Sequence, residues 1–411
     1  MWEGVDDLLD IQSPRLKEVA DNVSAKSVGD FWKGVHETGS PLIEDINHQG
    51  QHLITFLYQE VEPLDNVVVL LGPAGLDYAR NKMEKIAGTN IWFRSYLVHE
   101  DAKFQYLLSP NDPLTYPIDM LPDLEKLAER EAGFIIDPLN KWPYPINNPI
   151  VSTVGMDAND LTIIKKSLKG TYETFSIWSD ELKNKRKIGL YIPQHIDMNN
   201  TVEMLTFLDG ELNPDLIPAL NIIDALIQAK QIKPIVVALV DSIDREKEMG
   251  CNQQFSNFLS NELTAYIEEK TSIKLGHDNC ICGFSMGGIG ALYTAINRTK
   301  VYKNALMVST PLYWSPQDYK ESEYLSWYIA HKQTKPANIY IECGKMEDHS
   351  EFQRFFGGTS NLLSNRHLRN VLIAKAYKHR YYEYEGGHDF IQWGDSLERG
   401  LLYFYGIKKF T

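Results

Sequence analysis

The stretch that most constrains the fold is CGFSMGGIGALY at residues 282–293, where Ser285 stands between glycines. The residues before it, HDNCIC, end in small side chains that suit a β-strand, and those after it, IGALYTAINR, have the apolar spacing of a helix. The pentapeptide GFSMG at 283–287 therefore predicts a serine on a sharp strand-to-helix turn. A Cβ two residues before or after the serine would meet the neighbouring strand or helix, which explains the glycines. The alternative is an ordinary glycine-rich turn whose serine only caps the helix.

A hydroxyl becomes a nucleophile at neutral pH only beside a base, so a catalytic serine requires a histidine. In this topology the histidine follows the last strand, and His388 comes after the strand-like YYEYEGG (381–387) and before a helical pattern. A carboxylate after the preceding strand would orient the imidazole. The segment NIYIECGKMEDHSEF (338–352) supplies Glu347, which we favour, and its neighbour Asp348. Another acid, or a Ser–His dyad, remains an alternative.

Two backbone N–H groups are needed to hold the oxyanion of an acyl-transfer intermediate. The first would be that of Met286, the residue after the serine. The second would come from the loop LTFLDGELNP (205–214), where we predict Leu212, with Glu211 as the alternative. An ordinary turn between a strand and a helix would have the same sequence pattern.

The chain divides into two regions with different patterns. Up to about residue 150, short runs such as HLITFLYQEV (52–61) and NIWFRSYLV (90–98) alternate with turn signals and predict an N-terminal β-sandwich over 1–150. A stretch rich in Pro and Asn precedes a predicted linker at 151–180. From 181 to 411, strand and helix patterns alternate, which predicts an α/β domain with a doubly wound, mostly parallel sheet.

Composition narrows the function classes. The N-terminus is acidic without a signal-peptide pattern, and no run of about 18 apolar residues occurs, so we expect a soluble, cytoplasmic protein without a membrane partner. The 41 basic and 55 acidic residues give a net charge of −14, which argues against a nucleic-acid partner. Four cysteines form neither a metal-ligand spacing nor a disulfide framework.

With these residues assembled, the chain resembles the enterochelin (enterobactin) esterase family, cytoplasmic serine hydrolases that open catecholate siderophore trilactones. The likeness extends over nearly the whole chain. It rests on FLDGELNPDLIPAL and REKEMGCNQQF, on the nucleophile turn GFSMGGIGALYTA, on the histidine loop GGHDFIQWGDSLERGL, and on DFWKGVHETGSPLIE near the N-terminus. The resemblance implies an α/β-hydrolase domain preceded by an immunoglobulin-like β-sandwich.

Residue by residue, the resemblance implies Ser285 as nucleophile, His388 as general base and acid, and Glu347 as the favoured acid. It also implies a pocket for an anionic ferric catecholate, which guanidinium groups and aromatic faces would bind. The candidates are Arg245, Trp314 and Trp393; a structural salt bridge and core packing are the alternatives. No cofactor is implied, because iron would arrive only as part of the siderophore substrate.

Two departures from the family pattern concern loops expected near the substrate. Gly394 stands where the family commonly has arginine after the tryptophan, and PLYW (311–314) replaces the usual Gly-Ser before the aromatic residues. They leave hydrolysis intact and leave open which siderophore is cut. The rival functions are a serine hydrolase for another ester, thioester or peptide, and a non-catalytic siderophore-binding protein.

Overall fold

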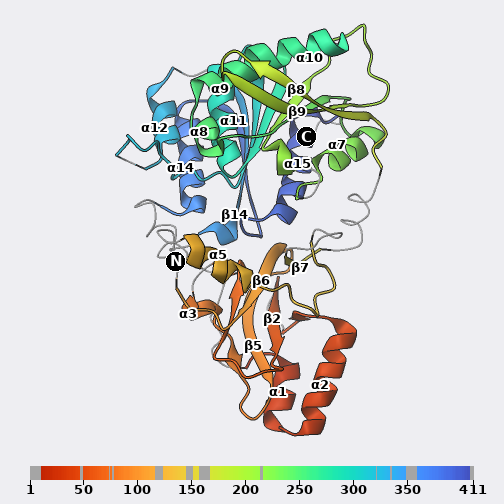
Figure 1. The fold of residues 1–411 in the computed structure, drawn as a ribbon, viewed down its shortest axis with the longest axis vertical. Helices are drawn as coiled ribbons and strands as arrows, with labels where there is room; N and C mark the ends of the chain where they lie inside the picture. Colours follow the sequence, from red (N-terminus) through yellow and green to blue (C-terminus); the bar gives the residue numbers. More distant parts are fainter. Residues whose placement is uncertain are drawn as a thin grey trace. The chain divides into compact units, whose positions relative to one another are not determined.

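The computed structural model describes residues 11–46, 50–73, 75, 78–115, 124–144, 151–156, 167–212, 216–320, 322–333, 336–348 and 359–407. The chain forms two compact units, each with its own sheets (Figure 1). The first comprises Met1–Asp157 and Glu385–Asp389; the second comprises Ala158–Tyr384 and Phe390–Thr411.

The first unit contains two antiparallel sheets. One has the order β1 (Leu42–Glu44), β2 (Gln51–Gln59), β5 (Ile91–His99) and β4 (Glu84–Lys85). The other has the order β3 (Val67–Leu70), β6 (Phe104–Pro110) and β7 (Ser152–Val154). The rings of Phe56 on β2 and Tyr106 on β6 lie 4.7 Å apart between centroids, so the two sheets share a core. The predicted β-sandwich is confirmed.

Helices α1 (Pro14–Asp21) and α2 (Ala25–Thr38) cover part of this sandwich. Phe31, Trp32 and Val35 recur at helical spacing and pack in one cluster with Leu57 and Phe93 of the first sheet. Ser13 and Ser24 cap the two helices by accepting backbone N–H groups of the first turn. The unit also contains the short helix α3 (Tyr78–Asn81) and α5 (Leu124–Ala132).

The second unit is built on an eight-stranded sheet. Its order is β15 (Lys378–Tyr384), β14 (Asn338–Gly344), β13 (Tyr302–Val308), β12 (Asn279–Phe284), β10 (Met204–Leu208), β11 (Val236–Val240), β9 (Asn184–Ile192) and β8 (Thr171–Ser179). The six strands from β15 to β11 pair in parallel, while β9 is antiparallel to both β11 and β8. This is the predicted doubly wound, mostly parallel sheet.

Helices cover both faces of this sheet (Figure 1). Along β11, Val236, Ala238 and Val240 belong to one hydrophobic cluster, and Val237 and Leu239 belong to the other. Both faces are therefore buried, which explains the continuous apolar run in this strand. One face carries α7 (Ala219–Gln228) and α15 (Phe390–Tyr405). The other carries α8 (Arg245–Met249), α9 (Gln253–Asn257), the π-helical η2 (Phe258–Leu263), α10 (Thr264–Thr271), α11 (Met286–Asn297), α12 (Tyr324–His331) and α14 (Asn361–Ala374).

The predicted linker at 151–180 is wrong at both ends. Strand β7 pairs with β6 in the first unit, and β8 pairs with β9 along its whole length in the second. The sequence concealed β8 because it is the edge strand of its sheet and most of its side chains are exposed, so it lacks a buried strand's apolar run. The middle of the predicted linker, 157–166, lies outside the described residues. Over the described ranges, no helix combines the length and apolar character needed to cross a bilayer.

Candidate active site

Ser285 lies on the turn between β12 and α11. Its backbone has φ 52° and ψ −129°, in the region of positive φ that side-chain-bearing residues rarely occupy. Its N–H donates to the carbonyl of Val308 at 3.0 Å, and its carbonyl accepts the N–H of Gly288 at 2.9 Å. The surrounding structure therefore holds the serine in a strained conformation, as the pentapeptide predicts.

The neighbouring glycines leave no room for a side chain. A Cβ on Gly283 would lie 2.0 Å from the carbonyl oxygen of Gly287. A Cβ on Gly287 would lie 2.9 Å from Oδ2 of Asp209. The close approach of strand, helix and the loop after β10 thus requires both glycines that flank the serine.

The remaining predicted groups follow parallel strands of the same sheet. Glu347 ends the 3-10 turn η3 (Lys345–Glu347) directly after β14, and His388 lies between β15 and α15. Leu212 ends the 3-10 turn η1 (Gly210–Leu212) just after β10. Because parallel strands end at one edge of a sheet, these connections leave the sheet at the edge where β12 delivers Ser285, the usual place of ligand sites in doubly wound folds.

Glu347 is held by a dense set of hydrogen bonds. Its side chain is buried, with 3% exposed. Its Oε1 accepts the backbone N–H of Gly344 at 2.7 Å, the hydroxyl of Ser309 at 2.8 Å and the hydroxyl of Tyr384 at 3.2 Å. Its Oε2 accepts the side-chain amide of Asn361 at 2.5 Å. Four donors fix the carboxylate in one orientation.

The predicted role of Leu212 as second oxyanion donor does not fit the structure of the loop after β10. The N–H of Leu212 donates to the carbonyl of Asp209 at 3.0 Å and closes the 3-10 turn. An N–H committed to this bond is a poor oxyanion donor, so the assignment to Leu212 is wrong. Glu211, the alternative donor, precedes Leu212 in the same 3-10 turn, and its role stays a prediction. Met286, the predicted first donor, is the first residue of α11.

Arg245 makes the structural salt bridge that was the alternative to substrate binding. Its Nε and Nη2 donate to the two carboxylate oxygens of Asp209 at 2.9 and 2.8 Å. Asp209 is 1% exposed, and burial raises the pKa of its carboxyl, while the hydrogen bond from Arg245 opposes that rise. The pair joins the start of α8 to the loop after β10.

The two predicted tryptophans differ in environment. Trp393 is 4% exposed, stacks on Phe284 with 5.3 Å between ring centroids, and donates its indole N–H to Ser309 at 2.9 Å. The prediction that it contacts substrate is therefore wrong, because the residue is part of the core and supports the Glu347 network. Trp314 is partly exposed and packs beside Gly250, where a Cβ would lie 2.9 Å from its ring. Its role in substrate binding stays a prediction.

Sequence reasoning missed four residues that hold this site: Asp209, Ser309, Asn361 and Tyr384. Asp209 stood in the LDG segment, one residue before the turn of the oxyanion loop, and could have been found there. Ser309 follows β13 with φ 50° and is fully buried, yet a single serine after a strand gives no pattern. Asn361 and Tyr384 are distant in sequence, and only folding brings them to the carboxylate.

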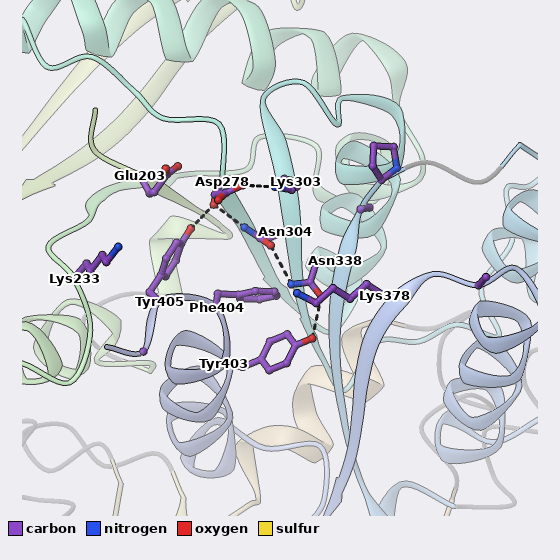
Figure 2. Close-up of a pocket in the computed structure, with 14 residues that line it drawn as sticks. Glu203, Lys233, Asp278, Lys303, Asn304, Asn338, Lys378, Tyr403, Phe404 and Tyr405 are labelled. Carbon is purple, nitrogen blue, oxygen red and sulfur yellow. Dashed lines mark hydrogen bonds and ion pairs between the residues drawn. The ribbon is translucent and has the colours of Figure 1, made fainter. Parts of the chain in front are cut away.

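A cavity of about 790 Å³ opens at the opposite edge of the same sheet, where the parallel strands begin (Figure 2). Its polar groups largely pair with one another. Lys303 lies 2.7 Å from Asp278, and the hydroxyl of Tyr403 donates to Asn338 at 3.0 Å. None of the predicted site residues lines it. The cavity is therefore not the candidate active site.

A strained serine on a strand-to-helix turn, with a carboxylate and a histidine on later connections of a doubly wound sheet, defines an ester hydrolase of the α/β-hydrolase type. Residues 179–404 match the family model Esterase, described as "Putative esterase". The match covers more than half of the chain, and the chain belongs to this esterase family.

Curated relatives agree with the resemblance to enterochelin esterases. The iron(III) salmochelin esterase of Escherichia coli O6:H1 is 23% identical, with 90% of this chain and 92% of that protein covered. The iron(III) enterobactin esterase of Dickeya dadantii is 21% identical, with 93% and 94% covered.

Solved structures show the same fold. The ferric enterobactin esterase of Salmonella typhimurium superposes with a TM-score of 0.73 at 20% identity, covering 91% of this chain and 98% of that chain. The enterobactin esterase of Shigella flexneri, in the presence of enterobactin, gives 0.68 at 21% identity, covering 93% and 98%. The likeness inferred from the motifs is confirmed.

Proposed function

We propose that this esterase hydrolyses the ester bonds of a catecholate siderophore trilactone such as enterobactin and so releases iron in the cytoplasm. The observation that carries the proposal is the strained Ser285 turn, in a chain that aligns over at least 90% of its length with iron(III) salmochelin and enterobactin esterases. Opening the trilactone separates the catecholates of the chelate, which weakens iron binding through loss of effective concentration.

The reaction is acyl transfer through Ser285. Its Oγ attacks a seryl ester carbonyl while His388 takes the hydroxyl proton. The tetrahedral oxyanion accepts hydrogen bonds from the N–H groups of Met286 and Glu211. His388 then returns the proton to the leaving alkoxide, which departs as the alcohol and leaves an acyl-serine. Water attacks this ester by the same steps and releases the acid and free Ser285.

We assign Glu347 as the acid that orients His388, with Asp348 as the alternative. The donors around Glu347 support this assignment, because a carboxyl group fixed in one orientation can hold the imidazole in one tautomer. Asp348 follows it directly and is less buried. The hydrolysis requires no protein-bound metal, since iron enters only as part of the substrate.

Of the three residues expected to bind the ferric catecholate, we retain only Trp314 as a principal contact. Arg245 already pairs with Asp209, and Trp393 is buried, so neither is the principal contact for a ferric catecholate. Trp314 remains the candidate aromatic contact, since the residue is only partly buried.

Product analysis tests the proposal. Wild type and Ser285→Ala are incubated with ferric enterobactin, and products are separated by chromatography and identified by mass spectrometry. Linear trimer, dimer or monomer formed only by wild type supports both the nucleophile and the substrate class. Labelling of Ser285 by a fluorophosphonate without product from any trilactone would instead identify a hydrolase for another ester. No labelling of folded protein would favour a binding protein.

A further inference from the structure

The loop after β10 is clamped to the segment after β11 at two points. Asp209 pairs with Arg245 through two hydrogen bonds, as described above. Two residues further on, the carboxylate of Glu211 accepts the backbone N–H of Ser242 at 3.1 Å and also bonds the Ser242 hydroxyl. Both clamps reach the five-residue stretch 241–245, so this stretch determines where the loop lies.

The backbone between the two clamps has little freedom. Asp209 has φ 55°, a conformation that a non-glycine residue keeps only when its surroundings enforce it. A Cβ on Gly210 would lie 2.7 Å from the backbone nitrogen of Val240, so the loop touches the end of β11. The direction of the Glu211 N–H therefore depends on the contacts that hold Asp209 in place.

The carboxylate of Asp209 also reaches the first turn of α11. Its Oδ2 is the atom that a Cβ on Gly287 would meet at 2.9 Å, and Gly287 directly follows Met286. One buried side chain therefore touches both structures that carry the oxyanion donors. An unpaired negative charge at this place would repel a developing oxyanion, whereas the guanidinium of Arg245 neutralises it.

We propose that Asp209 and Arg245 form a positioning pair that sets the spacing of the Met286 and Glu211 N–H groups and keeps the oxyanion site free of net negative charge. The proposal rests on the proposed acyl-transfer function. Neither side chain is a catalytic residue, because each acts through the backbone donors. Both oxygens of Asp209 accept hydrogen bonds from Arg245; the carboxylate is 1% exposed, although the Arg245 side chain is 42% exposed.

The test measures kcat and KM separately for the full chain with p-nitrophenyl butyrate. The variants are Asp209→Asn, Arg245→Lys, Arg245→Met and the double variant Asp209→Asn with Arg245→Met. Removing a whole oxyanion donor costs about 100-fold or more in kcat, so displacing one should cost Arg245→Met about 10- to 100-fold, with KM within about twofold of wild type. Arg245→Lys should lose less, because it retains the charge but not the paired geometry.

Two further readouts separate positioning from simple stability. The affinity for an aryl trifluoromethyl ketone, which forms an oxyanion on Ser285, should fall in parallel with kcat/KM. The double variant should be faster than Arg245→Met alone, because it no longer contains an unpaired carboxylate beside the oxyanion.

A matched control is Arg399→Met. Arg399 also makes two hydrogen bonds, at 2.9 and 2.7 Å, to a fully buried carboxylate, that of Glu342. Its loss should lower the melting temperature without changing kcat.

Two outcomes would overturn the proposal. Arg245→Met and Asp209→Asn with wild-type kcat and a lower melting temperature would show a purely structural pair. A raised KM with unchanged kcat would make Arg245 a substrate contact. If Asp209→Asn does not fold, Arg245→Lys decides the question. Full activity of Ser285→Ala would instead refute the proposed function, so the two failures are distinguishable.

Discussion

Replacing Ser309 tests the hydrogen-bond network under the proposed catalytic acid. Its buried hydroxyl lies 2.8 Å from Oε1 of Glu347, 2.6 Å from the hydroxyl of Tyr384 and 2.9 Å from the indole nitrogen of Trp393. Ser309→Ala deletes this one oxygen and leaves the rest of the side chain unchanged. The variant therefore removes three contacts with little change in packing.

The magnitude follows from the partners. Taking the acceptor from a buried indole N–H costs about 1–3 kcal/mol, and taking a donor from a carboxylate costs about 1.5–3 kcal/mol. Because the same hydroxyl makes these two contacts and the one to Tyr384, the losses are not independent. We expect the free energy of unfolding to fall by about 3 kcal/mol, a large part of a typical domain's stability.

The assay is urea denaturation followed by circular dichroism, with Ser326→Ala as the control. Ser326 is equally buried, yet its hydroxyl has no hydrogen-bond partner among the described residues. Its removal should change the free energy of unfolding by less than about 0.5 kcal/mol, or stabilise the protein slightly. Equal losses in the two variants, or a loss below about 1 kcal/mol for Ser309→Ala, would refute the reasoning.

Three further predictions concern the turn, the acid and the pH response. Ser285→Gly should melt at a higher temperature than Ser285→Ala, because glycine accepts φ 52° at little cost; equal melting temperatures would argue against strain. If Glu347 is the acid, Glu347→Gln lowers kcat by about 10⁴-fold and Asp348→Asn by less than about tenfold, whereas the reverse pattern would identify Asp348. The hydrogen bond from Arg366 lowers the pKa of Glu383 below its ordinary 4.5. Glu383 therefore stabilises the folded state above that pH. The contribution is about 1 kcal/mol, because Arg366 is 40% exposed and solvent screens the ion pair. In urea titrations, the difference in free energy of unfolding between wild type and Glu383→Gln should vanish as pH falls below about 4.5 and through the depressed pKa. A difference that persists at lower pH would contradict the conclusion that the ionised Glu383 stabilises the fold through Arg366.

Local patterns were enough to locate the candidate nucleophile. The strand, the turn and the helix around Ser285 are all encoded within the continuous stretch 279–297, and the flanking glycines reflect the steric limits of the turn. The order of strands and helices after residue 181 was equally readable, because strands buried on both faces have continuous apolar runs. Strand β8 was missed because an edge strand lacks that signature.

Side-chain partners could not be read in the same way. Arg245 and Trp393 both belong to types that suit an anionic aromatic ligand. In the structure, however, Arg245 forms a salt bridge with Asp209, and Trp393 is buried. Residue type states what a side chain can bind, whereas burial and neighbours determine what it does bind. The same holds for Leu212, whose N–H is used by a 3-10 turn that the sequence did not reveal.

The sequence by itself determined the fold class, the esterase family and the turn that carries Ser285, because each depends on the order and spacing of residues close together in the chain. Only the tertiary structure decided which groups surround Glu347 and which clamp the loop after β10. The side-chain hydrogen bonds among these contacts join residues 14 to 84 positions apart, and the pairing of distant residues depends on how the strands are ordered in the sheet. Hydrogen bonds of this kind form only once packing has brought the elements together, so no local pattern records them.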